Sequence, residues 1–135
     1  MSSELLIRVS SHIALAAVLA GALWRRAGLP SAAAAVVAAA FWLALEWSTG
    51  DPRLLFPFAM GCAGAAAWRW SWTGAAAAAV LFLAARALTG ASTPVLQTEI
   101  LGTIFCLLAA MAVRRAGPAA SAAAGSMAGL AALLL

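Results

Sequence analysis

The sequence predicts an all-α protein, a polytopic transmembrane helix bundle of about six short, alanine-rich spans. Of the 135 residues, 66% are hydrophobic and 9% are charged, and the mean hydropathy is +1.03. A soluble domain carries about 25% charged residues. The 8 basic and 4 acidic side chains of this chain are therefore too few to cover a water-soluble globule. We expect one integral-membrane domain that covers residues 1–135.

The first three apolar runs each stop at a polar break. Residues 5–24 end at an Arg-Arg pair, and residues 31–47 end at the segment Ser-Thr-Gly-Asp-Pro-Arg. The third run covers residues 54–70 and stops in the tryptophan-rich segment 68–74. Only this short segment separates it from the next run, so a six-span chain has to make a very tight turn here.

The last three apolar runs cover residues 73–88, 95–113 and 119–135. A segment with glycine and proline separates the first two, and the segment Arg-Arg-Ala-Gly-Pro separates the second from the third. The last run is rich in alanine, and a peripheral or loosely inserted helix is the alternative for it. That alternative reduces the count from six spans to five.

The lengths and patterns of these runs are typical of membrane helices. Each has about 16 to 20 residues, or roughly 24–30 Å as a helix at 1.5 Å per residue, and the hydrocarbon core of a bilayer is about 30 Å thick. The runs show no two-residue alternation, and alanine is a poor strand former. Because backbone groups in lipid must be satisfied within the segment, we expect helices.

Six spans sort the charged residues to two sides of the membrane. One side has five arginines and no acid: Arg25, Arg26, Arg69, Arg114 and Arg115. The other side has three arginines and every acid: Arg8, Arg53, Arg86, Glu4, Glu46, Asp51 and Glu99. The positive-inside rule places the first side in the cytoplasm and both termini outside. The abundance of alanine and the absence of lysine, asparagine and tyrosine are typical of a GC-rich bacterial genome. We therefore expect the bacterial inner (cytoplasmic) membrane.

Small residues are placed for close helix packing. Gly125 and Gly129 form a GxxxG pattern in the last run, and Gly61 and Gly64 form a small patch in the third. Helices in lipid associate through such close approaches. Packing within the chain is one interpretation, and pairing of the last helix with another subunit is the alternative.

Most charged residues lie at the ends of the predicted spans, but Arg86 and Glu99 do not lie cleanly in a loop. Glu99 is the fifth residue of its run, and Arg86 is two residues before the end of the preceding run. The short connection between these runs makes them antiparallel neighbours, so we expect an Arg86–Glu99 ion pair near the outer side. A charged group inside a membrane suggests a function, and the alternatives are a structural pair, part of a solute or ion path, and snorkelling without pairing.

The single histidine, His12, lies inside the first span, one turn after Arg8. Hydrogen bonding between helices is one role for it, and proton or ligand binding is the other. Glu46 lies near the outer end of the second span. We expect His12, Glu46, Arg86, Gln97 and Glu99 to line a shallow, outward-facing polar vestibule, as a binding site or an ion path.

Other site chemistry is missing from the sequence. No nucleophile has a base at a recognisable spacing, so we predict no catalytic residue, and an enzyme is the disfavoured class. There is no metal-binding motif, and no cofactor is indicated. Cys62 and Cys106 lie in apolar runs and are expected to be packing residues. The arginines form no basic stripe, which argues against nucleic acid as a partner. The lipid bilayer is the expected partner, together with further copies of the chain or another membrane subunit.

These observations predict two functions of different classes. The first is a solute or ion transporter, or its membrane-embedded substrate-binding component, because the ionisable groups cluster on one side. The second is an accessory or scaffold subunit of a larger membrane complex, because small-residue faces are abundant and no extramembrane domain is expected.

Overall fold

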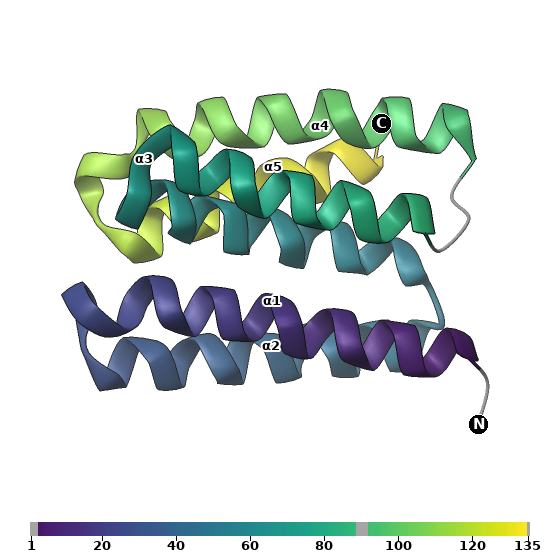
Figure 1. The fold of residues 1–135 in the computed structure, drawn as a ribbon, viewed down its shortest axis with the longest axis horizontal. Helices are drawn as coiled ribbons and strands as arrows, with labels where there is room; N and C mark the ends of the chain where they lie inside the picture. The colour runs from purple at the N-terminus through teal and green to yellow at the C-terminus, as the bar shows by residue number, and fades with distance from the viewer. Residues whose placement is uncertain (1–2, 89–91, 135) are drawn as a thin grey trace.

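The computed structural model describes residues 3–88 and 92–134, and this part of the chain is all-α (Figure 1). It contains five α-helices, α1 (Ser3–Ala27), α2 (Leu29–Thr49), α3 (Leu55–Leu88), α4 (Thr93–Ala112) and α5 (Pro118–Leu134). Two short 3-10 helices, η1 (Pro52–Leu54) and η2 (Arg114–Ala116), connect them. The predicted helical class is therefore confirmed. The alanine-rich segments are good helix formers.

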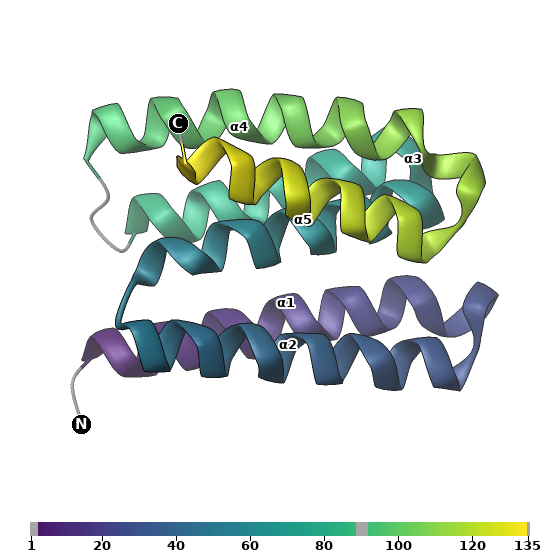
Figure 2. The same cartoon turned by 180° about the vertical axis from the view of Figure 1, so that it is seen from behind.

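Helix α3 consists of two antiparallel halves. Its 34 residues are interrupted at Ser71, where φ is 63° and ψ is −149°, and the chain turns back along its own path (Figures 1 and 2). Gly74 makes this turn tight, because a Cβ there would lie 2.9 Å from the carbonyl oxygen of Ala66. The described chain thus runs along the bundle six times, and the six predicted helical segments are confirmed, the short turn after residue 70 included.

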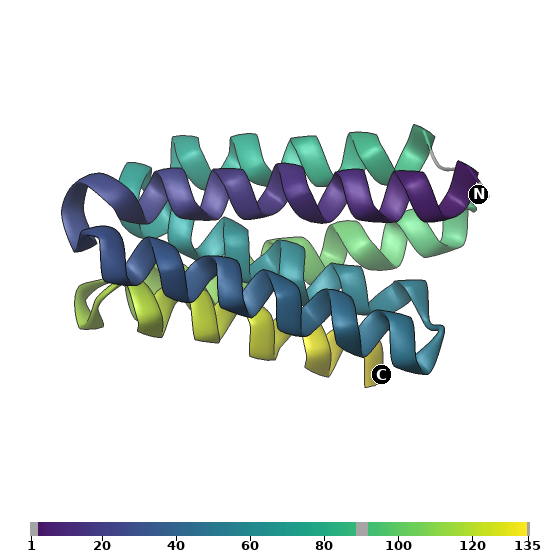
Figure 3. The same cartoon turned by 90° about the horizontal axis from the view of Figure 1, so that it is seen from below.

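The six passes form two layers. Helices α1 and α2 make an antiparallel hairpin, and α3, α4 and α5 make the thicker second layer (Figures 1 and 2). Seen from below, α1 and α2 lie side by side in front of the other passes (Figure 3). All helices run close to the long axis, so the connections gather at the two ends.

Local sequence explains where α2 ends. Gly50 has φ 71° and ψ 9°, and its N–H donates to the carbonyl oxygen of Glu46 at 2.8 Å. A left-handed residue that closes the last turn in this way is the usual role of glycine at a helix C-terminus. The cap fixes the last turn of α2, which carries Glu46.

Helix α5 is packed directly onto the first half of α3. A Cβ added to Gly64 would overlap the carbonyl of Ser121, and one added to Gly125 would overlap the carbonyl of Met60. A Cβ on Gly129 would lie 3.1 Å from the Cα of Pro57. The GxxxG pattern is therefore used within the chain, and the last helix packs against α3 whether or not it crosses the membrane. The reason is that glycines on both helices let the two backbones touch.

Apolar side chains cover the outside of the molecule. Each helix exposes large hydrophobic residues, such as Ile13 on α1, Val37 on α2, Val80 on α3, Phe105 on α4 and Met127 on α5. The buried set includes polar and charged residues: His12, Glu46, Glu99, Thr103 and Ser121. Among the described helices, α3 taken as a whole and α4 are long and apolar enough to cross a membrane.

The charged residues separate to the two ends of the bundle as the sequence predicts. One end contains the α1–α2 connection, the turn of α3 and the α4–α5 connection (Figure 1, left). The five arginines of the acid-free set belong to these segments. The opposite end contains the start of α1, the α2–α3 connection and the ends of α3 and α4 that carry Arg86 and Glu99.

Candidate functional site

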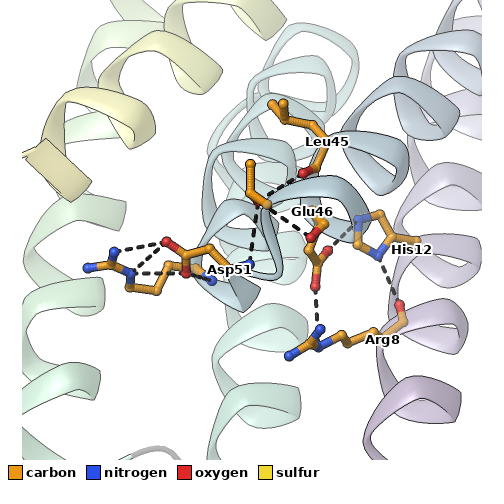
Figure 4. Close-up of polar contacts among 7 residues, drawn as sticks. Arg8, His12, Leu45, Glu46 and Asp51 are labelled. Carbon is orange, nitrogen blue, oxygen red and sulfur yellow. Dashed lines mark hydrogen bonds and ion pairs between the residues drawn. The ribbon is translucent and has the colours of Figure 1, made fainter.

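The α1–α2 hairpin encloses a carboxylate. Glu46, which is 1% exposed, projects from the last turn of α2 towards His12 and Arg8 on α1 (Figure 4). His12 Nε2 lies 3.1 Å from Glu46 Oε2, and Arg8 Nε lies 3.5 Å from Glu46 Oε1. Arg8 and His12 are four residues apart, which places them on one face of α1. One helix face thus supplies both cationic partners of the acid on α2.

The hydrogen bond on the other side of the imidazole defines its protonation. His12 Nδ1 lies 2.9 Å from the carbonyl oxygen of Arg8. A carbonyl oxygen only accepts, so Nδ1 must carry the hydrogen of this bond. In a neutral ring Nε2 then presents a lone pair, and at 3.1 Å this lone pair would face the Glu46 carboxylate. The contact becomes attractive when a proton is present, either on Nε2 or on the Glu46 carboxyl group.

The pair is close but poorly aligned. Neither His12 Nε2 nor the two Glu46 oxygens has a hydrogen-bond partner of suitable geometry among the residues that the structure describes. Burial without such a partner is costly for a polar group. These buried atoms are therefore left without a hydrogen bond among the described residues.

Helix α3 supports the histidine from the opposite side. The imidazole of His12 stacks on the ring of Phe58, with centroids 5.3 Å apart and planes at 7°. One turn further along α1, the carbonyl oxygen of Leu15 accepts a hydrogen bond from the Cys62 thiol at 3.5 Å. These contacts fix the rotation of α1 and hence the direction in which His12 points.

The predicted Arg86–Glu99 ion pair is confirmed. Arg86 Nε lies 3.0 and 3.2 Å from the two Glu99 oxygens, and Arg86 Nη2 lies 3.0 Å from Oε1. Glu99 is 5% exposed, and the side chain of Arg86 is 17% exposed. The two-pronged contact joins the second half of α3 to α4 and is the strong form of this interaction.

Two groups of charged residues have now been described, the contact of Glu46 with Arg8 and His12 and the Arg86–Glu99 pair. Both groups lie at the end of the bundle that carries the acids. We call the five residues Arg8, His12, Glu46, Arg86 and Glu99 the polar cluster.

The geometry differs from the expected vestibule in two ways. His12, Glu46 and Glu99 are buried, so the site is enclosed by protein and is not a shallow, open depression. Gln97 lies on the exposed side of α4, because two residues correspond to about 200° around a helix and place it opposite Glu99.

Arg8 was missing from the predicted site residues. The signal was present, since an arginine one turn before a histidine shares its helix face. The burial of Glu46 by α3 had no comparable signal, because the sequence does not state which face of α2 meets the other layer.

The described residues offer no cluster of three or more His, Cys, Asp or Glu side chains that could hold a metal ion. Cys62 and Cys106 are free and buried. They contact neighbouring helices and contribute no group to the polar cluster.

A comparison with family models, with curated proteins and with solved structures finds no match to this chain.

Proposed function

We propose that the chain is a polytopic protein of the bacterial inner membrane. Two features support this. Large apolar side chains face outwards on all five helices, and ionisable groups lie inside or at the ends. Water would favour the opposite arrangement, whereas a bilayer rewards an apolar exterior and tolerates ionisable groups that face the interior.

The ends of the bundle support an orientation. The acid-free end carries five arginines. The exposed tryptophans Trp24, Trp70 and Trp72 lie in or next to its turns, and the exposed Trp47 lies at the opposite end. Tryptophan prefers the headgroup level, and arginine is enriched on the cytoplasmic side. We place the acid-free end in the cytoplasm and both termini outside.

The orientation has a direct test by reporter fusion. A reporter fused after Gly50 should report the outer side, and one fused after Gly117 should report the cytoplasm. Identical locations for the two fusions would contradict the topology, because Gly50 and Gly117 lie at opposite ends of the bundle.

Within this topology the chain acts as a transporter of a small solute or ion, or as the membrane-embedded binding component of one. The observation that carries the proposal is the enclosed His12–Glu46 contact, which needs a proton to be attractive. Buried histidine and carboxylate groups in membrane helices are typical of proton relays. The polar cluster is the binding site, and the proton is the ion for which it already has both binding atoms.

The net charge of the polar cluster is compatible with reversible binding of a proton. Two arginines, Arg8 and Arg86, balance the two carboxylates of Glu46 and Glu99. An added proton on the His12–Glu46 pair leaves one positive charge in excess. Without the added proton the cluster is neutral. Because the protonated cluster is positively charged, it favours either release of the proton or binding of an anion.

An accessory or scaffold role is the second candidate. Its motivation was the abundance of small-residue faces, and the glycines of α3 and α5 are occupied by each other. The transporter is therefore the better-supported proposal.

Proton flux in proteoliposomes tests the transporter. Vesicles that contain the purified protein and a pH-sensitive dye are exposed to a potassium diffusion potential. We expect the wild type to pass protons and Glu46→Gln to lose most of this flux. The matched control is Arg53→Gln, which alters an exposed residue at the same end and should retain the flux.

A wild-type flux equal to that of protein-free vesicles would contradict proton-linked transport. Equal fluxes in the wild type and in Glu46→Gln would contradict the assignment of the site.

A further inference from the structure

A groove separates α1 from the second half of α3. It has a volume of about 830 Å³, and its walls are mostly apolar and small: Ala17, Gly21, Gly74, Ala77, Ala78 and Leu81 line it, with Trp70 and Thr73 at one end. From Thr73 to Leu81 the groove follows eight residues of helix, or roughly 12 Å. Several lining residues are exposed, so the groove opens sideways on the outer surface of the bundle.

The groove begins at the arginine-rich end and runs towards the middle of the bundle. Trp70 and Thr73 flank the turn of α3 at Ser71, and Gly21 lies nearly two turns before the end of α1. The polar cluster lies at the opposite end. The groove is therefore a separate feature.

A positive charge lies next to Trp70 at one end of the groove. The guanidinium carbon of Arg69 lies 5.6 Å from the ring centroid of Trp70, which forms part of the wall. The Nε atom of Arg69 is buried and has no hydrogen-bond partner among the described residues. A guanidinium charge next to an apolar groove suits a ligand with an anionic head and a hydrocarbon tail.

The other charged residues at this end of the bundle also favour an anionic head group. Four more arginines belong to the turns of this end, and no acidic residue does. One of them, Arg114, is engaged by the turn itself, because its Nε donates to the carbonyl oxygen of Trp68 at 3.3 Å. The remaining positive charge has no carboxylate to neutralise it at this end.

We propose that this groove binds one acyl chain of an anionic phospholipid, with the phosphate at Arg69. The apolar walls take the chain, and the sideways opening lets the lipid enter from the leaflet. A basic pocket between membrane helices is a known type of lipid headgroup site. The proposal depends on membrane insertion and does not depend on transport through the polar cluster.

Fluorescence quenching by brominated lipid tests the site. The protein is reconstituted with increasing amounts of either phosphatidylglycerol or phosphatidylcholine that carries bromine on the acyl chains. The contribution of Trp70 is the difference between the wild type and Trp70→Phe. We expect half-quenching of this component at an about tenfold lower mole fraction of phosphatidylglycerol, which corresponds to ~1.4 kcal/mol.

Two variants and one control locate the effect. Gly21→Leu fills the groove, and it should fold normally because a Cβ at this position meets no atom within 4 Å; the preference should vanish. Arg69→Gln removes the headgroup charge and should reduce the preference about fivefold, since one basic residue near an anionic lipid contributes about 1 kcal/mol. Ala40→Leu places the same side chain at an exposed position of α2 and should leave the preference unchanged.

Equal quenching by the two lipids in the wild type would overturn the proposal. A preference that survives Gly21→Leu would also overturn it. Cross-linking distinguishes the competing occupant: if Gly21→Leu abolishes a dimer and the wild type shows no lipid preference, the groove is an interface between copies of the chain.

Discussion

Two helix pairs are held together in different ways, α3 with α5 and α1 with α2. Glycine backbones touch in the first, as at Gly64 and Gly125, whereas the second encloses the charged contact of Glu46 with His12 and Arg8. The stability of backbone packing does not depend on protonation, whereas the stability of a buried charge pair does. The α3–α5 contact therefore does not depend on protonation, whereas the contact of Glu46 with His12 does.

The largest expected effect comes from breaking the second charged pair. Arg86→Met leaves the Glu99 carboxylate buried without the guanidinium that it contacts at 3.0 Å. Removal of one partner of a buried pair costs about 3–5 kcal/mol. The free energy of unfolding in detergent micelles, measured with a chemical denaturant, checks this value.

The double variant Arg86→Met/Glu99→Met supplies the control. It removes both charges, so it should regain most of the lost stability. A double variant as unstable as Arg86→Met would show that packing, and not the unpaired charge, controls this contact.

A single methyl group should break the glycine interface. Gly125→Ala places a Cβ against the carbonyl of Met60, and overpacking of this kind costs about 1–3 kcal/mol. Gly21→Ala is the matched control, since its Cβ meets no atom within 4 Å and alanine favours helix by about 0.5–1 kcal/mol. Thermal unfolding of the two variants should move in opposite directions. A normal transition for Gly125→Ala would mean that α3 and α5 are not in backbone contact.

The turn inside α3 should be improved by glycine. Ser71 has φ 63° and ψ −149°, a region that essentially only glycine occupies without strain. Ser71→Gly relieves about 1–3 kcal/mol of strain and gives back about 0.5–1 kcal/mol through greater freedom of the unfolded chain. We expect a net gain in stability of about 1 kcal/mol. A loss of stability would indicate that the hydroxyl group and its contact with Arg114 matter more than the backbone.

The exposed Asp51–Arg53 pair should have the smallest effect on stability. Asp51 accepts three hydrogen bonds from the Arg53 side chain and one from its backbone N–H, and these lower the pKa of the Asp51 carboxyl group. A lowered pKa in the folded state means that the stabilisation exists above the unfolded pKa and is lost as the pH falls through the folded pKa. The Arg53 side chain is 65% exposed, so solvent screens the pair and the change is small.

Asp51→Asn measures this contribution. The variant should match the wild type below the folded pKa and be slightly less stable near neutral pH. A large difference at neutral pH would contradict the argument that burial, and not charge pairing alone, makes the polar cluster important.

Local sequence was sufficient to predict some parts of this molecule. The Arg86–Glu99 pair follows from a short connection between two helices, because the connection fixes which residues lie at equal depth. The six helical segments follow from the spacing of the polar breaks. The two charged ends follow from the same spacing.

Other parts depend on contacts between segments that are distant in the sequence. The sequence offered Gly125 and Gly129 as a packing face, but it did not name α3 as the partner. It also left the rotation of each helix open, which is why Gln97 was placed in the site and Arg8 was not. Helix rotation depends on tertiary packing, such as the stacking of His12 on Phe58.

The protonation state of His12 tests the central claim most directly. Because the chain has one histidine, labelling with ¹⁵N-histidine gives an NMR spectrum of this ring alone in lipid bilayers. We expect a hydrogen on Nδ1, because this atom contacts the carbonyl oxygen of Arg8 at 2.9 Å, and an Nε2 shift that changes in Glu46→Gln, because the carboxyl group lies 3.1 Å from Nε2. A neutral ring with a bare Nδ1, and with shifts unaffected by Glu46→Gln, would contradict the account.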